Sequence, residues 1–300
     1  MDIVATKQLT KRFGSIFALQ QVDLQLPPGR IYGLVGNNGA GKTTLFRLLA
    51  GLLQPSAGSY SLLGESTSRG QNRARKRIGF LIEGPIYYPT MSARSNLRNI
   101  QLLLGRKDKI EITNALVLVG LDPNSKQLMH NYSMGMKQRY GIAAALIGDP
   151  ELLILDEPLN GLDPRGAREI NTLLKSLCAQ GKTIILSSHI LSELYKTATD
   201  YIFMEKGRII EQITHETLEE RCGFQLIVRC SDIQLAAETL RESALDCEVL
   251  IDNDRLCLPH CTATAGEISR LLKKVGLDSH IETAGITLED YFFSLLEKSS

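Results

Sequence analysis

Hydrophobic side chains follow two distinct patterns in the strand-forming parts of the chain. Residues 3–9 and 22–26 alternate between apolar and polar positions, which is typical of half-exposed antiparallel strands. Short continuous apolar runs occur at 31–35, within 151–158 and at 183–186, and such runs indicate strands buried on both faces of a parallel sheet. The first two thirds of the chain therefore predict two kinds of sheet.

Helical spacing appears between these strands. Apolar side chains recur three and four residues apart directly after residue 44, at Leu45, Leu48, Leu49 and Leu52. Three further helices are predicted at 94–104, 111–119 and 137–147. Strands that alternate with helices in this way predict an α/β fold.

The last third of the chain has its own pattern. Its order is strand, helix, strand, strand, helix, strand, with elements predicted at 225–229, 232–242, 247–251, 255–258, 265–275 and 280–284. This βαββαβ order is that of a ferredoxin-like module. A closing helix is predicted at 287–296, with Thr287 as N-cap and Glu289 and Asp290 in its first turn. We therefore expect two domains, 1–214 and 215–300, and by fold analogy favour a structural or dimer-bracing role for the second over a small-molecule regulatory one.

The charge balance limits the classes of partner. With 34 Lys and Arg against 33 Asp and Glu, the chain has no overall field that would gather nucleic acid. Basic residues do cluster between 69 and 77, but no aromatic residue is interleaved with them, so a solvated helix face or linker is the favoured interpretation. We expect no nucleic acid partner.

No apolar run approaches the roughly 20 residues that a membrane-spanning helix requires. Asp2 stands where a signal peptide would carry positive charge, and no apolar segment follows it, so we expect a cytoplasmic protein that can dock on a membrane protein. In that reducing compartment the six cysteines are most simply small hydrophobic residues. A zinc site at Cys257, His260 and Cys261 remains an alternative, although the spacing matches no standard structural site.

A complete phosphate-binding loop connects the apolar strand 31–35 to the helix that follows. It reads G-N-N-G-A-G-K-T and fits the form G-x-x-x-x-G-K-[ST]. Glycines suit this loop because its backbone N–H groups must turn inward around phosphate oxygens, which a Cβ would obstruct. Lys42 would place a positive charge on the β- and γ-phosphates, and Thr43 would offer a hydroxyl to Mg²⁺. The nucleotide-binding residues expected here are Gly36, Asn37, Asn38, Gly39, Ala40, Gly41, Lys42, Thr43 and Thr44.

Two carboxylates follow the apolar run near residue 155. Ligands meet parallel sheets at the carboxyl ends of the strands, so we expect Asp156 beside the phosphate loop, where it would help to hold Mg²⁺. Glu157 is placed to accept a proton from the water that attacks the γ-phosphate. Together with the phosphate loop, these residues predict a nucleoside triphosphatase.

With these motifs in this order, residues 3–213 resemble the ATP-binding subunits of ABC transporters. The stretch 132–139, Y-S-M-G-M-K-Q-R, is similar to the signature motif of that family. The resemblance implies that Ser133 and Gly135 contact the γ-phosphate of an ATP held by the opposite subunit. It also implies that Asp163, in N-G-L-D, lies on the loop between the two sites, that His189 is the switch histidine, and that Phe13 stacks on adenine.

The chain departs from the family pattern at two positions. Met134 stands where the signature usually has glycine, yet both phosphate-contacting residues of the motif are present. Glu83 stands where most members have a glutamine that ligates Mg²⁺; a carboxylate keeps the oxygen ligand but loses the amide donor. A glutamate followed by G-P and an aromatic residue is similar to subunits of the bacitracin-resistance and lantibiotic-immunity type, and a neutral exchange is the alternative.

The resemblance implies the following architecture and function. The fold is a P-loop ABC-type ATPase with an antiparallel β subdomain, a helical subdomain at about 84–148, and the small α+β domain at the end. Two such subunits, identical or paired, would hold two ATP molecules with Mg²⁺ and power a separate membrane permease from the inner face of the cell membrane. Export of, or self-protection against, peptide antibiotics is the favoured use. The alternatives are a soluble ABC ATPase not engaged in transport and a non-catalytic regulatory cassette.

Overall fold

The computed structural model describes residues 2–221, 225–243, 245, 247–259, 261, 263–285 and 287–298. The chain separates into two compact units, Met1–Ile213 and Thr214–Ser300, and each is described by itself. The break after Ile213 lies one residue before the boundary expected from the sequence, after residue 214.

The first unit contains a six-stranded sheet in the order β5-β6-β7-β3-β8-β9. Strand β3 pairs in parallel with β7 and β8, and β6 pairs in parallel with β5 and β7. Every residue of β3, β6 and β7 is buried, as their continuous apolar runs predict. The strands are β3 (Ile31–Val35), β5 (Ile78–Leu81), β6 (Leu152–Leu155), β7 (Thr183–Ser187), β8 (Asp200–Glu205) and β9 (Arg208–Thr214).

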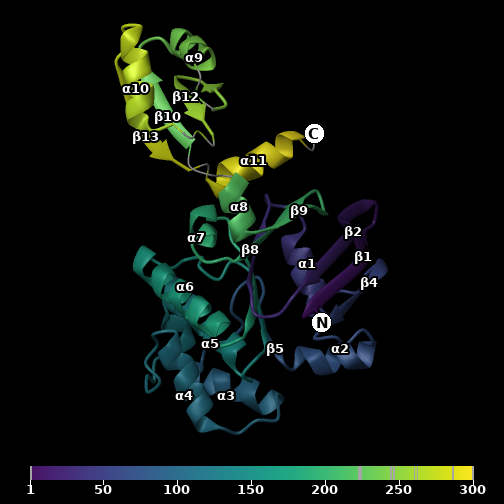
Figure 1. Cartoon of the computed structure of the whole chain (residues 1–300). Helices are drawn as coiled ribbons and strands as arrows, with labels where there is room; N and C mark the ends of the chain where they lie inside the picture. The colour runs from purple at the N-terminus through teal and green to yellow at the C-terminus, as the bar shows by residue number, and fades with distance from the viewer. Residues whose placement is uncertain are drawn as a thin grey trace. The chain divides into compact units, whose positions relative to one another are not determined.

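A three-stranded antiparallel sheet, in the order β2-β1-β4, accompanies the parallel one. Its strands lie side by side in Figure 1, next to the helix α1. Buried residues of both sheets and of α1, among them Leu9, Phe46 and Ile154, belong to one hydrophobic core. This core fixes the start of α1 against the parallel sheet. The elements are β1 (Val4–Phe13), β2 (Ile16–Leu26), β4 (Ala57–Leu62), α1 (Lys42–Leu49) and α2 (Ser68–Arg75).

Three contacting helices, α3, α4 and α5, form the helical subdomain between β5 and β6. Each begins at a capping side chain: Ser92, Asp108 and Ser133 accept hydrogen bonds from backbone N–H groups of the first turn. The helices start one to three residues before the predicted positions, because the caps and not the apolar spacing set their first turns. The remaining elements of this part are α3 (Ala93–Leu103), α4 (Lys109–Leu118), the 3₁₀ turn η1 (Met129–Asn131), α5 (Met134–Leu146), α6 (Pro164–Ala179) and α7 (Leu191–Tyr195).

The second unit has the predicted ferredoxin-like topology. Its four strands are antiparallel and lie in the order β11-β12-β10-β13, and the helices α9 and α10 pack on the sheet. One prediction was wrong in extent, because β11 begins at Leu250 and not at residue 247. Thr287 caps the closing helix as predicted, accepting a hydrogen bond of 3.1 Å from the Asp290 N–H. The elements are α8 (His215–Arg221), β10 (Gln225–Cys230), α9 (Ile233–Arg241), β11 (Leu250–Asp252), β12 (Arg255–Leu258), α10 (Ala265–Lys274), β13 (Ser279–Ala284) and α11 (Leu288–Lys298).

Two further predictions bear on metal and membrane. Across the described residues, no helix has both the length and the apolar character needed to cross a membrane. His260 of the zinc alternative lies outside the described residues, and within them no three His, Cys, Asp or Glu side chains gather in a metal-binding group.

Candidate nucleotide-binding site

The phosphate loop connects β3 to α1 at the carboxyl end of the parallel sheet. Helix α1 begins at Lys42, and its N-cap Gly41 adopts a left-handed backbone with φ 110°. The order of strand, loop and helix is therefore as predicted. The first-turn N–H groups of the helix, which have no partner within a helix, are directed toward the loop.

The loop glycines are required for different reasons. A Cβ on Gly36 would lie 2.5 Å from the Met204 carbonyl oxygen of β8, and one on Gly41 would lie 2.6 Å from the Ala18 carbonyl oxygen of β2. Gly39 has open space around its Cβ position but a φ of 85°. The expectation that all three glycines keep Cβ atoms away from phosphate was thus incomplete, because packing against neighbouring strands already demands Gly36 and Gly41.

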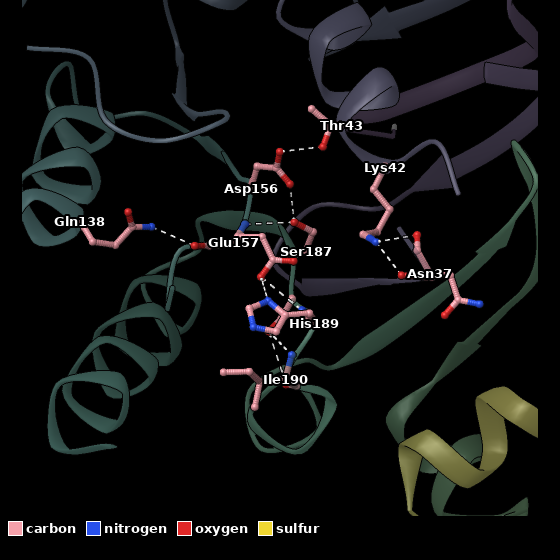
Figure 2. Close-up of polar contacts among 11 residues, drawn as sticks. Asn37, Lys42, Thr43, Gln138, Asp156, Glu157, Ser187, His189 and Ile190 are labelled. Carbon is pink, nitrogen blue, oxygen red and sulfur yellow. Dashed lines mark hydrogen bonds and ion pairs between the residues drawn. The ribbon is translucent and has the colours of Figure 1, made fainter. Parts of the chain in front are cut away.

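Lys42 is folded back onto the loop. Its ammonium donates hydrogen bonds of 2.5 Å to the Gly36 carbonyl oxygen and 3.2 Å to that of Asn37, as Figure 2 shows. Burial lowers the pKa of Lys42, and the negative charges of Glu157 and Asp156 act in the opposite direction. A cation held inside the loop by carbonyl groups is available to phosphate oxygens that enter it.

Asp156 is the centre of a buried hydrogen-bond network (Figure 2). The Thr43 hydroxyl donates to one carboxylate oxygen at 2.9 Å, and the Ser187 hydroxyl donates to the other at 2.6 Å. Only 8% of Asp156 is exposed and Ser187 is fully buried. The structure therefore brings Asp156 to the phosphate loop, as the strand argument predicted. It adds Ser187, which sequence reasoning missed although this serine lies two residues before His189.

Glu157 is held at three points. Its backbone N–H donates to the Ser187 hydroxyl at 3.0 Å, and its carbonyl oxygen accepts a bond of 2.8 Å from the Gln138 side-chain amide. One carboxylate oxygen lies 2.6 Å from Nδ1 of His189. Glu157 also has a left-handed backbone, with φ 50°, which side chains other than glycine adopt at an energetic cost. The structure thus places the predicted base and the predicted switch histidine in direct contact.

The oxygen atoms that meet at Thr43 are suitable ligands for a magnesium ion. A threonine hydroxyl and a carboxylate converge there, and hard oxygen ligands of this kind are those that Mg²⁺ takes in nucleotide sites. Glu83 was expected in the same group, but its carboxylate pairs with Arg47 of α1. Glu83 also has a left-handed backbone, with φ 59°. The structure therefore brings Thr43 and Asp156 together, and holds Glu83 on a different partner.

The residues assigned to the signature and to the loop between the two sites make local contacts within the chain. The Ser133 hydroxyl caps α5 by accepting a bond of 3.2 Å from the Met136 N–H, and the Asp163 carboxylate caps α6 by accepting one of 2.9 Å from the Gly166 N–H. A Cβ on Gly135 would lie 3.1 Å from the Gly161 carbonyl oxygen. These contacts lie among residues 133–166, and none of the three involves residues 36–43.

Phe13 ends β1 and is 48% exposed, so it is not a buried core aromatic. The Lys11 ammonium lies 5.0 Å from the centre of its ring. Because about half of Phe13 is exposed, its ring is accessible to a ligand.

Comparison with known proteins decides the family. A sequence model described as ABC transporter matches residues 19–160. The bacitracin transport ATP-binding protein BcrA of Bacillus licheniformis is 38% identical over 299 residues, which cover 98% of this chain and 97% of BcrA. The chain belongs to the ABC transporter ATP-binding proteins. It is accordingly an ATPase that binds ATP.

Two other similarities complete this comparison. The lantibiotic transport ATP-binding protein SrtF of Streptococcus pyogenes is 40% identical to this ABC protein over 224 residues, 74% of this chain and 96% of SrtF. A solved structure of an ATP-binding subunit of an ABC transporter superposes with a TM-score of 0.67 at 26% identity, and covers 74% of this chain and 93% of that one. The α/β fold of an ABC-type ATPase is thereby confirmed.

Proposed function

We propose that this ABC ATPase works as a pair of cassettes on a separate membrane permease, at the inner face of the cell membrane, and that the transporter exports peptide antibiotics or protects the cell against them. The observation that carries the proposal is the similarity along nearly the whole chain to a bacitracin transport protein, joined to the glutamate at position 83. The relative named for lantibiotic transport supports the same class of cargo.

The residues of the site divide the chemistry between them. Lys42, already enclosed by the loop, binds the β- and γ-phosphate oxygens. Thr43 and Asp156 would hold Mg²⁺, which supplies positive charge to the same phosphates. The three-point hold on Glu157 orients its carboxylate to accept a proton from the attacking water. His189 fixes that carboxylate through Nδ1.

Pairing of two cassettes completes each site. Ser133 caps α5 and Met134 beside it is 67% exposed, so the signature is accessible to a second chain. We infer that Ser133 and Gly135 of one cassette meet the γ-phosphate bound in the other. ADP lacks that phosphate, so it would bind the open and closed pairs almost equally and would not drive closure.

Cargo is tested in the native host. Deletion of the gene should raise sensitivity to bacitracin or to a lantibiotic several-fold, and restoration should require an intact Glu157. A β-lactam serves as the control antibiotic, because it is not a peptide of this class. Unchanged sensitivity to a panel of such peptides would refute the cargo assignment and leave the ATPase assignment intact.

A further inference from the structure

Arg47 and Glu83 form an ion pair at the edge of the nucleotide site, and the chemistry described above does not use it. An Nη atom of Arg47 donates a hydrogen bond to Oε1 of Glu83. The two side chains are 38% and 54% exposed. The pair ties α1 to the segment that follows β5.

Helix α1 presents this arginine one turn beyond the predicted metal ligand. Thr43 and Arg47 are four residues apart, so they share one face of the helix. The Thr43 hydroxyl reaches Asp156, while Arg47 reaches Glu83. Asp156 also contributes to the raised pKa of Arg47, after the hydrogen bond and charge of Glu83. Two side chains on one face of α1 therefore donate hydrogen bonds to two different carboxylates.

Negative charge accumulates in the adjoining groove. Glu83, Asp156 and Glu157 all line a groove of about 640 Å³, together with the cation Lys137. ATP is itself strongly anionic, and a third carboxylate without a partner would oppose its entry. Arg47 removes that obstacle, because it neutralises the charge of Glu83.

The backbone supports a defined position for this carboxylate. Glu83 and Gly84 are consecutive left-handed residues, with φ 59° and 109°, so the chain bends sharply where the side chain departs. We propose that Arg47 is a positioning residue that holds Glu83 and neutralises its charge, and so allows this glutamate-containing site to accept ATP. The inference rests on the proposed nucleotide chemistry of the loop.

The test is a double-mutant cycle on ATP binding. The full-length protein is compared with Arg47→Gln, Glu83→Gln and the double variant, using a fluorescent ATP analogue in EDTA, so that the readout is independent of turnover and metal. We expect Arg47→Gln to weaken binding about two- to fivefold at low salt, as for an exposed ion pair, and less at high salt. In the Glu83→Gln background the same change should have no effect.

Matched variants separate positioning from other roles. Arg47→Lys keeps the charge and should restore most of the affinity. Arg165→Gln removes another exposed arginine, paired with Glu169, and should leave affinity unchanged. Equal weakening by Arg47→Gln with and without Glu83, or no weakening at all, would overturn the inference. If the unmodified protein fails to bind the analogue more tightly than Lys42→Ala, the proposed nucleotide chemistry itself fails, and the inference with it.

Discussion

Replacement of Ser187 by alanine should damage both carboxylates of the site at once. The buried hydroxyl donates to Asp156 at 2.6 Å and accepts from the Glu157 N–H at 3.0 Å. A hydrogen bond to a charged group contributes about 1.5–3 kcal/mol, and a buried N–H left without an acceptor costs about 1–3 kcal/mol. Asp156 keeps its bond from Thr43, so we expect a total loss of about 2–4 kcal/mol in the free energy of unfolding.

Thermal unfolding and ATPase kinetics measure the two consequences. For a unit of this size, 1 kcal/mol corresponds to about 2–4 °C, so Ser187→Ala should lower the midpoint by about 4–16 °C. Its kcat should fall about 10- to 100-fold, because Asp156 and Glu157 lose their shared anchor. Ser188→Ala is the matched control: that hydroxyl accepts a local bond of 3.0 Å from the Ile190 N–H and donates one of 3.4 Å to the Ile190 carbonyl oxygen, and a shift of about 2–4 °C is expected. Equal midpoints and equal kcat values for the two variants would refute the reasoning.

Three further variants test other parts of the site. Glu157→Gln should reduce turnover at least about 100-fold and still bind ATP. Light scattering should show a dimer with ATP but not with ADP. An unchanged ATPase rate would contradict the assignment of Glu157 as the base. Glu83→Gln should keep ATP binding and measurable turnover, since Thr43 and Asp156, whose oxygens suit Mg²⁺, are unchanged; loss of nucleotide binding in calorimetry would contradict this. Gly36→Ala should lower the unfolding midpoint of the nucleotide-free protein more than Gly39→Ala, because only the former meets a strand carbonyl within 2.5 Å; the opposite ranking would speak against the packing argument.

The parts of the site that belong to a short sequence motif could be predicted. Lys42 and Thr43 follow from the loop, and the position of Asp156 follows from one rule about the carboxyl ends of buried strands. The ferredoxin-like order of the second unit also followed from the hydrophobic pattern of its segments. Each of these predictions rests on a pattern that can be read within a short stretch of sequence.

The features that sequence reasoning missed depend on long-range contacts. Ser187 lies 31 residues from Asp156, and Gln138 lies 19 residues from Glu157. Arg47 meets Glu83 across 36 residues. The residue types at these positions do not predict a hydrogen bond between them. The contacts form only when the strands and α5 pack together. The start of β11 was predicted too early, at residue 247 and not at Leu250. Its side chains are partly exposed and give little periodic signal.

The central claim is that this ATPase works on a membrane permease. Its most direct test is affinity purification of the Glu157→Gln protein from detergent-solubilised membranes of the native host in the presence of ATP, followed by identification of what is bound in stoichiometric amount. We predict a polytopic membrane protein that is retained with ATP and lost with ADP. Stoichiometric ribosomal or DNA-bound partners, with no membrane protein in either nucleotide, would contradict the claim and favour a soluble ABC ATPase.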